Sequence, residues 1–366
     1  MTRDSLAAPA RRIVVKVGTH ALTGPAGRLD TAFVERLSAQ IAGVLRAGVD
    51  VTLVSSGAIG AGMAELDLPH RPKSLPVLQA TAAVGQGQLM RTFHDAFGRF
   101  GVKVAQILLT RDDFQHRSRY LNIRNTIAAL TDCYALPIIN ENDTVSVDEI
   151  RFGDNDHIAA LVANMVDADL LMLLTDVDGF FRGGKVVGRL DAIDEGVLAD
   201  AGGAGRAGMG GMRSKLQAAG MVTGAGAAVV IANARVDDCL PRILAGEELG
   251  TLCVPARRRM SARRRWIGHA ARASGKLHVD AGAARAVRDL GKSLLPSGIT
   301  GVGGKFAKGA TVAIVGPDGR QIARGLTNYA ADQIDRIRGL RSSQIAKVLG
   351  DKPYDEVVHR NNMTLS

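Results

Sequence analysis

The chain has 366 residues, 46% hydrophobic and 22% charged, a composition typical of a folded globular protein with room for two domains. No apolar run reaches the roughly 20 residues of a membrane span, and the start MTRDSLAAPARR lacks the apolar core of a signal peptide. The cysteines Cys133, Cys239 and Cys253 show no CxxC spacing, so we expect reduced packing residues. Together these features predict a cytoplasmic protein.

The net charge of +10 is divided unevenly along the chain. Residues 1–256 contain 25 basic and 28 acidic side chains, whereas residues 257–366 contain 21 and 8. The net charges are therefore −3 and +13, which predicts a domain boundary near residue 257 and different partners for the two parts.

Strand-like apolar runs alternate with amphipathic stretches of helical period over the first 256 residues. We expect strands at 13–17, 49–54, 103–108, 136–139, 169–174, 227–231 and 251–254, and helices at 31–47, 76–99, 120–131, 156–166 and 212–223. The wholly apolar run Leu170–Leu174 is typical of a parallel strand buried on both faces. The first domain is therefore predicted to be α/β, a mainly parallel open sheet between helices.

The remaining segments indicate a loop, a joint and a second domain. Residues 201–211 are rich in glycine and predict a loop that ends at a helix start, and 257–265 form a basic joint. Short β-like runs follow at 276–279, 299–302, 311–315 and 321–324, so we expect a small β-rich domain. The predicted organisation is 1–256 for the α/β domain, 257–272 for a basic linker, 273–356 for the β-rich domain and 357–366 for a tail.

Polar residues follow several predicted strands, at the sheet edge where α/β proteins bind ligands. Lys16 ends the first strand, and Ser56 lies in the small-residue segment 55–62 after the second, where backbone N–H groups can approach an anion. Solvent exposure of the strand end or tight helix packing would also explain these residues. The segments 140–143 and 153–156 add amides and carboxylates that suit an amino acid, although a turn or a helix cap is the plainer alternative.

Two further segments suit a nucleotide. Thr175 and Asp176 end another strand, and residues 210–215 join the glycine loop to a helix start, where backbone donors and Lys215 would cradle phosphate. The Walker-like triplet 291–293 lacks the first glycine and a preceding strand, and the GxGxxG match at 203–208 opens no βαβ unit. The histidines show no ligand spacing, so we predict no protein metal site.

Taken together, these motifs resemble the amino acid kinase family over nearly the whole chain. The resemblance rests on VVKVGT (14–19), VSSGAI (54–59), AAVGQ (82–86), NENDTV (140–145), EIRFGDND (149–156), LLTDVDG (173–179) and GGMRSK (210–215). The end of the chain is similar to a PUA domain, an RNA-associated module, at 280–287 and 293–299.

The resemblance implies a kinase that transfers the γ-phosphoryl group of ATP, with Mg²⁺, to the γ-carboxylate of L-glutamate, the first step of proline biosynthesis. It also implies inhibition by proline and a homo-oligomer. By position, Lys16 and Lys215 would flank the phosphoryl group and Asp156 would orient them. The implied glutamate-binding residues are Ser56, Asn140, Asp143 and Asn155, and the implied ATP-binding residues are Lys16, Gly18, Thr175, Asp176, Met209, Gly210, Gly211, Met212, Arg213, Ser214 and Lys215.

The chain departs from the family pattern in the nucleotide loop. Met209 stands where a threonine is usual, and the segment between Gly179 and Gly208 is shorter than the family norm. Two alternatives therefore stay open: an amino acid kinase with another carboxylate acceptor, such as aspartate, N-acetylglutamate or carbamate, and an RNA-binding regulatory protein that acts through the basic end of the chain.

Overall fold

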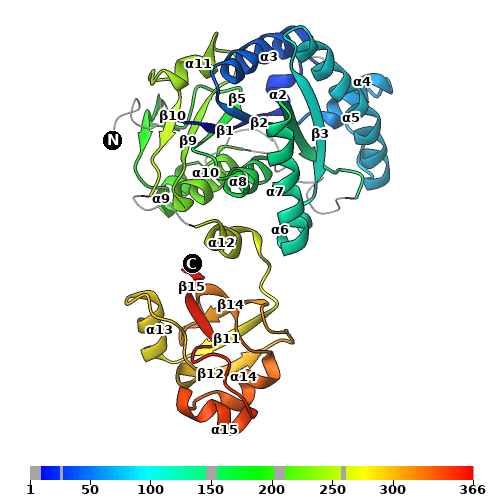
Figure 1. Cartoon of the computed structure of the whole chain (residues 1–366). Helices are drawn as coiled ribbons and strands as arrows, with labels where there is room; N and C mark the ends of the chain where they lie inside the picture. The colour runs from blue at the N-terminus through cyan, green and yellow to red at the C-terminus, as the bar shows by residue number, and fades with distance from the viewer. Residues whose placement is uncertain (1–9, 25–27, 146–154, 202–210, 257–260, 366) are drawn as a thin grey trace. The chain divides into compact units, whose positions relative to one another are not determined.

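The computed structural model describes residues 10–24, 28–145, 155–201, 211–256 and 261–365. Its chain divides into two compact units, one of residues 1–114 and 118–259 and one of residues 115–117 and 260–366. Helices and strands of both units are labelled in Figure 1. None of the helices in the described ranges is long and apolar enough to cross a membrane.

The first unit is built on an eight-stranded sheet in the order β3-β4-β2-β1-β5-β9-β10-β8. All neighbouring strands run parallel except β9 and β10, which confirms the predicted α/β class. The strands are β1 (Arg12–Val17), β2 (Asp50–Val54), β3 (Lys103–Leu109), β4 (Ala135–Glu141), β5 (Leu170–Thr175), β8 (Arg189–Leu190), β9 (Ala228–Asn233) and β10 (Thr251–Cys253), and a separate hairpin is formed by β6 (Phe181–Arg182) and β7 (Lys185–Val186).

Helices cover both faces of this sheet (Figure 1). They are α2 (Thr19–Leu22), α3 (Thr31–Arg46), α4 (Ala58–Glu65), α5 (Leu75–Gly98), α6 (Arg111–Gln115), α7 (Arg117–Asp132), α8 (Asn155–Val166), α9 (Glu195–Asp200), α10 (Met212–Ala225) and α11 (Cys239–Leu244). On one face, α3, α5 and α11 form a single apolar core with the sheet. On the other, α8 and α10 pack against each other and against the central strands.

The alternation of side chains along β1 places Lys16 on the functional face. Ile13, Val15 and Val17 belong to the core beneath α3, α5 and α11. Because successive strand side chains point to opposite faces, Lys16 lies on the face that α8 and α10 cover. The buried ammonium group of Lys16 therefore lies next to α8 and α10, the helices that carry Asp156 and Lys215.

Glycines let α4 and α5 approach until their backbones touch. A Cβ on Gly62 would lie 1.8 Å from the carbonyl oxygen of Thr81, and one on Gly85 would lie 1.8 Å from that of Ala58. Only glycine fits at such distances. Gly57, which precedes α4, has a φ of 93°, so the turn that follows the buried Ser56 also depends on glycine. The two helices are therefore held in a fixed register.

The second unit is a five-stranded mixed sheet in the order β12-β11-β13-β14-β15 with its own apolar core. Its strands are β11 (Gly275–Val279), β12 (Ile299–Gly303), β13 (Thr311–Val315), β14 (Gln321–Thr327) and β15 (Val358–Leu365), and its α-helices are α12 (Ala262–Arg265), α13 (Ala281–Arg288), α14 (Ala331–Ile337) and α15 (Ile345–Leu349). Short turns of 3-10 helix at Pro296–Gly298 and Ser342–Gln344 and of π-helix at Trp266–Ala270 complete it.

Three sequence-based expectations need correction. Residues 358–365, assigned to a tail, form β15 and pair with β14. Residues 262–270 of the predicted linker are helical, and Ile267 among them is fully buried. Cys239 and Cys253 are buried as expected, but Cys133 is exposed because it lies in the turn between α7 and β4.

Candidate active site

A carboxylate between two ammonium groups lies at the carboxyl end of the parallel strands. Lys16 Nζ is 2.7 Å from Asp156 Oδ1, and Lys215 Nζ is 3.1 Å from Asp156 Oδ2. All three side chains are at least 92% buried. They come from β1, the first turn of α8 and the first turn of α10, so the structure brings the three predicted catalytic residues together.

Burial and charge act in opposite directions on this cluster. Burial alone would raise the pKa of Asp156, but the charges of Lys16 and Lys215 and their hydrogen bonds hold it below the usual value. Burial lowers the pKa of the Lys215 ammonium, an effect that Asp156 partly offsets. The carboxylate is therefore ionised at neutral pH and compensates two buried cations.

The residue before Asp156 belongs to a chain of amides on the other side of the site. Asn155 Nδ2 donates to Ser56 Oγ at 2.9 Å and to Asn140 Oδ1 at 3.3 Å. Asn140 Nδ2 in turn donates to Gln86 Oε1 at 2.7 Å. Hydrogen bonds thus link three of the four predicted glutamate-binding residues. They also include Gln86, for which the sequence analysis predicted no role.

Asp143, the fourth, has no hydrogen bond to these amides in the part of the chain that the structure describes. It follows β4 and is partly buried. Burial raises the pKa of its carboxyl to about 6, and the charge of Arg71 opposes that shift. Arg71 is thus a second residue near the site that motif reading missed, because the two are 72 positions apart in the sequence.

The residues predicted to bind nucleotide lie around the same strand ends. Thr175 ends β5 and donates from Oγ1 to Asp176 Oδ1 at 3.0 Å, and Gly18 donates its N–H to Leu174 at 3.3 Å. Gly211 is the N-cap of α10, Ser214 Oγ lies 3.5 Å from Asp156 Oδ2, and Arg213 instead contacts the carbonyl of Leu198. Met212 is the first residue of α10, whereas Met209 and Gly210 lie outside the described residues.

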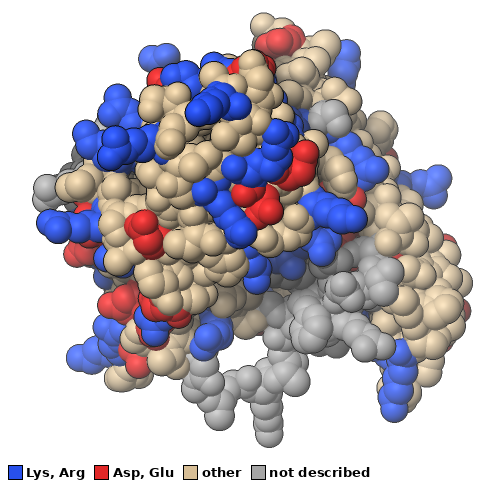
Figure 2. All heavy atoms as spheres, turned by 90° about the horizontal axis from the view of Figure 1, so that it is seen from below, with Lys and Arg blue, Asp and Glu red and all other residues tan. Residues whose placement is uncertain are grey.

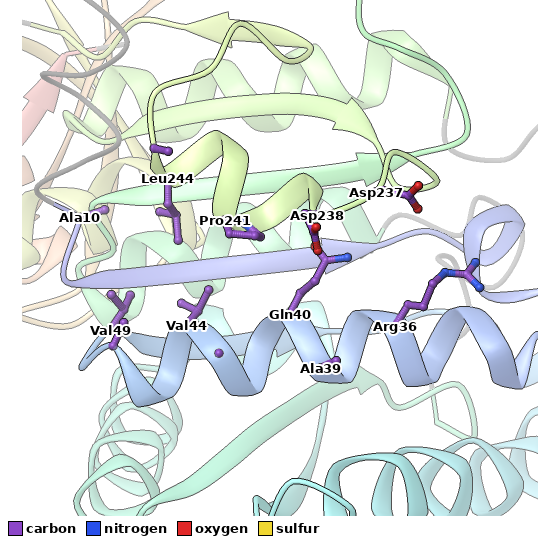
Figure 3. A pocket seen from close by; sticks show the side chains of 13 residues that line it. Ala10, Arg36, Ala39, Gln40, Val44, Val49, Asp237, Asp238, Pro241 and Leu244 are labelled. Carbon is purple, nitrogen blue, oxygen red and sulfur yellow. The ribbon is translucent and has the colours of Figure 1, made fainter.

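A groove of about 850 Å³ between α3 and α11 is a different feature. Figure 3 shows Val44 and Gln40 of α3 facing Pro241 and Leu244 of α11 across it. None of the predicted site residues that the structure describes lines it, and α3 and α11 cover the sheet face opposite to α8 and α10. The groove is therefore separate from the Lys16–Asp156–Lys215 cluster.

Two buried ammonium groups on one carboxylate, at the ligand-binding edge of an α/β sheet, are features of a phosphoryl-transfer enzyme. The sequence model of the amino acid kinase family matches residues 11–233, and that of the PUA domain matches residues 275–349. The chain belongs to the amino acid kinase family, whose members use ATP.

Curated relatives extend this result over almost the whole chain. It is 47% identical to a protein of Caldanaerobacter subterraneus subsp. tengcongensis, over 97% of both chains. It is 48% identical to one of Moorella thermoacetica, over 97% of this chain and 96% of the relative, and 44% identical to one of Geobacter sp. strain M21, over 99% and 100%. Each of these relatives is named glutamate 5-kinase.

We predict that Asp156→Asn lowers the free energy of unfolding by about 3–5 kcal/mol, because it leaves two buried ammonium groups without their counter-ion. Chemical denaturation followed by circular dichroism would measure this. The matched control is Asp191→Asn, since Asp191 pairs with Arg189 at 2.6 Å but is 74% exposed. That change should cost less than about 1 kcal/mol. Equal effects of the two substitutions would contradict the electrostatic account.

Proposed function

We propose that this chain transfers the γ-phosphoryl group of ATP to the γ-carboxylate of L-glutamate, giving γ-glutamyl phosphate and ADP, the first step of proline biosynthesis. One observation carries the proposal. Asn155 and Asp156 are consecutive residues at the start of α8, and one joins the amide chain while the other holds both lysines. An amino acid site and a phosphate site therefore meet at one helix end. The names of the relatives support glutamate as the acceptor.

On the phosphate side, Lys16 and Lys215 act as positioned cations. Phosphoryl transfer demands alignment and compensation of negative charge rather than covalent work by the protein. Both the acceptor carboxylate and the nucleotide are anionic, so two ammonium groups fixed by Asp156 reduce their repulsion. A carboxylate has a pKa of about 4.3 and is ionised at neutral pH, so the acceptor needs no general base.

On the acceptor side, Ser56, Asn140 and Asn155 supply hydrogen bonds to glutamate, and Asp143 pairs with its ammonium group. Hydroxyl and amide groups offer both donors and acceptors, which suits a ligand that carries two carboxylates and an ammonium. The hydrogen bonds already present among these three residues support this assignment, because they hold the groups in place before the substrate arrives.

The nucleotide is assigned to Gly18, Thr175, Asp176 and the start of α10, with Met209 and Gly210 as part of the same proposal. Backbone donors at a helix start and the two lysines fit a polyphosphate. The described residues contain no group of three metal-ligating side chains, and both oxygens of Asp156 face lysines. Mg²⁺ would thus be held mainly by phosphate oxygens, as is common for this ion, and supply further charge compensation there.

The test is ADP release by the purified chain with Mg-ATP and each of glutamate, aspartate and N-acetylglutamate. We expect turnover on glutamate alone and a hydroxamate from the trapped acyl phosphate. Lys16→Met should lower kcat by roughly 10²–10³-fold, as for the loss of other groups that stabilise transition-state charge. Turnover of another acceptor in place of glutamate would establish the alternative amino acid kinase, and no turnover on any acceptor would reject the kinase assignment.

The pKa of Asp143 gives this proposal a pH signature. Because burial raises that pKa to about 6, the carboxyl is ionised and able to pair with an ammonium only above this pH. The KM for glutamate should therefore rise as pH falls below about 6, by up to roughly tenfold per pH unit. Asp143→Asn should give a high KM that is flat between pH 5 and 8. A wild-type pH profile in that variant would assign the ionisation to another group.

Two further expectations complete the proposal: proline inhibits the reaction, and the chain forms a homo-oligomer. Adding proline to the acceptor assay tests the first, and light scattering of the purified chain tests the second. Unchanged turnover at saturating proline would reject inhibition by proline. A mass in solution of 38.5 kDa, that of a single chain, would reject the homo-oligomer.

We also propose RNA binding as a second function, carried by the second unit. The match to a PUA domain and the net charge of +13 after residue 256 support it. A groove of about 740 Å³ in this unit is lined by Lys292 and Arg360 but also by Asp280 and Glu356, so it adds no net positive charge. On the face shown in Figure 2 the basic side chains are spread among neutral and acidic ones, so we expect weak binding. Retardation of a structured RNA that disappears with added salt would support this role, and no retardation at low salt would remove it.

A further inference from the structure

Gln86 lies on α5 and reaches the chain of amides on the proposed amino acid side of the site. Its Oε1 accepts from Asn140 Nδ2 at 2.7 Å, across 54 positions of sequence. Gln86 follows Gly85, one of the two glycines at which the backbones of α4 and α5 touch. That contact fixes the register between Gln86 and the helix that follows Ser56, so the contact of Gln86 with Asn140 is built into the fold.

The direction of every hydrogen bond in this chain of amides follows from one backbone group. The N–H of Glu141 donates to Asn140 Oδ1 at 2.9 Å, and a backbone N–H is always a donor. Asn140 must therefore point its Nδ2 at Gln86, and Gln86 can accept this hydrogen bond only through its side-chain carbonyl oxygen. By the same reasoning Asn155 must point its Nδ2 at Asn140 Oδ1 and Ser56 Oγ.

This orientation leaves a buried acceptor without a partner. Asn155 Oδ1 is buried and has no hydrogen bond within the described ranges, and Gln86 Nε2 at the far end of the chain is in the same state. Buried polar groups are normally paired, so such atoms call for an explanation. An acceptor of this kind beside Asp156 is suited to the ammonium group of an amino acid.

We propose that Gln86 is a positioning residue for the amino acid substrate. The Glu141 N–H holds Asn140 by its Oδ1 and Gln86 holds it by its Nδ2, so the Asn140 amide is fixed at both ends in the orientation that leaves Asn155 Oδ1 available to the substrate ammonium. Without the Gln86 carbonyl, the buried Nδ2 of Asn140 loses its partner and the amide is held at one end only. The hydrogen bond from Asn155 to Asn140 Oδ1 is then positioned less firmly, and so is Asn155 Oδ1. This inference rests on the proposed function, since it assigns Gln86 to the acceptor side of that reaction.

The test compares three variants in the ADP-release assay with the complete chain. Gln86→Met keeps the length of the side chain and removes the acceptor, so the KM for glutamate should rise roughly ten- to hundredfold, the effect of losing one or two net hydrogen bonds. The KM for ATP and kcat should stay within about threefold of the wild type. Gln86→Glu keeps an oxygen that can accept from Asn140 and should recover most of the affinity. Gln88→Met, on the exposed side of the same helix, should change nothing.

The outcomes separate this inference from the proposed function. An active wild-type protein whose Gln86→Met variant keeps the wild-type KM for glutamate would overturn the inference alone, even if that variant melts at a lower temperature. Equal losses in Gln86→Met and Gln86→Glu would also overturn it, because they would indicate direct contact through Nε2. A wild-type protein inert with glutamate would reject the proposed function and the inference with it. If Gln86→Met does not fold, Gln86→Ser, too short to reach Asn140, takes its place.

Discussion

The ion pairs of Asp156 with Lys16 and Lys215 are the interaction on which the rest of the site depends. Two ammonium groups in a nearly dry environment repel each other, and each loses its hydration. One carboxylate with an oxygen turned toward each lysine makes their proximity possible. The same arrangement fixes two positive charges at a distance set by a rigid group, which is what a transferring phosphoryl group demands of its surroundings.

The position of Asp156 at the start of α8 links this cluster to the rest of the fold. The partial positive charge of a helix N-terminus favours a carboxylate there. The preceding residue, Asn155, points into the amide chain with Ser56 and Asn140. A single helix end therefore sets the spacing between the proposed acceptor and phosphate sides, and the sheet fixes it further because β1, β2 and β4 deliver Lys16, Ser56 and Asn140 to the same edge.

Much of the fold and of the candidate site could be predicted from the sequence, because the patterns that indicate them lie in short stretches of the chain. The apolar runs that become β1 and β5 read as buried parallel strands, and polar residues at their ends mark the edge that carries the site. Other features have no local signal. The glycine-rich α4 shows little apolar period, since its packing relies on the absence of side chains at Gly62. Polar residues in β15, such as Arg360 and Asn361, interrupt the apolar pattern that would predict a strand, although β15 pairs with β14.

The proposed role of Gln86 and the surroundings of Asp143 could not be predicted from the sequence for a similar reason. Gln86 is 54 positions from Asn140, and Arg71 is 72 positions from Asp143. The two residues of each pair come near each other only in the folded chain, because Gln86 and Arg71 lie on α5 and in the segment before it, whereas Asn140 and Asp143 lie at the end of β4 and after it. The sequence could identify the residue types that suit an amino acid and a phosphate, but the orientation of each amide follows from hydrogen bonds that exist only in the folded chain.

The most direct test of the central claim is a crystal structure of the complete chain with glutamate, Mg²⁺, ADP and aluminium fluoride, which mimics a transferring phosphoryl group. We expect the aluminium fluoride to lie between the glutamate γ-carboxylate and ADP. It should contact both Lys16 Nζ and Lys215 Nζ, while each lysine keeps its contact with Asp156. A fluoride that contacts only one lysine, or a complex in which Asp156 has released either of them, would contradict the account.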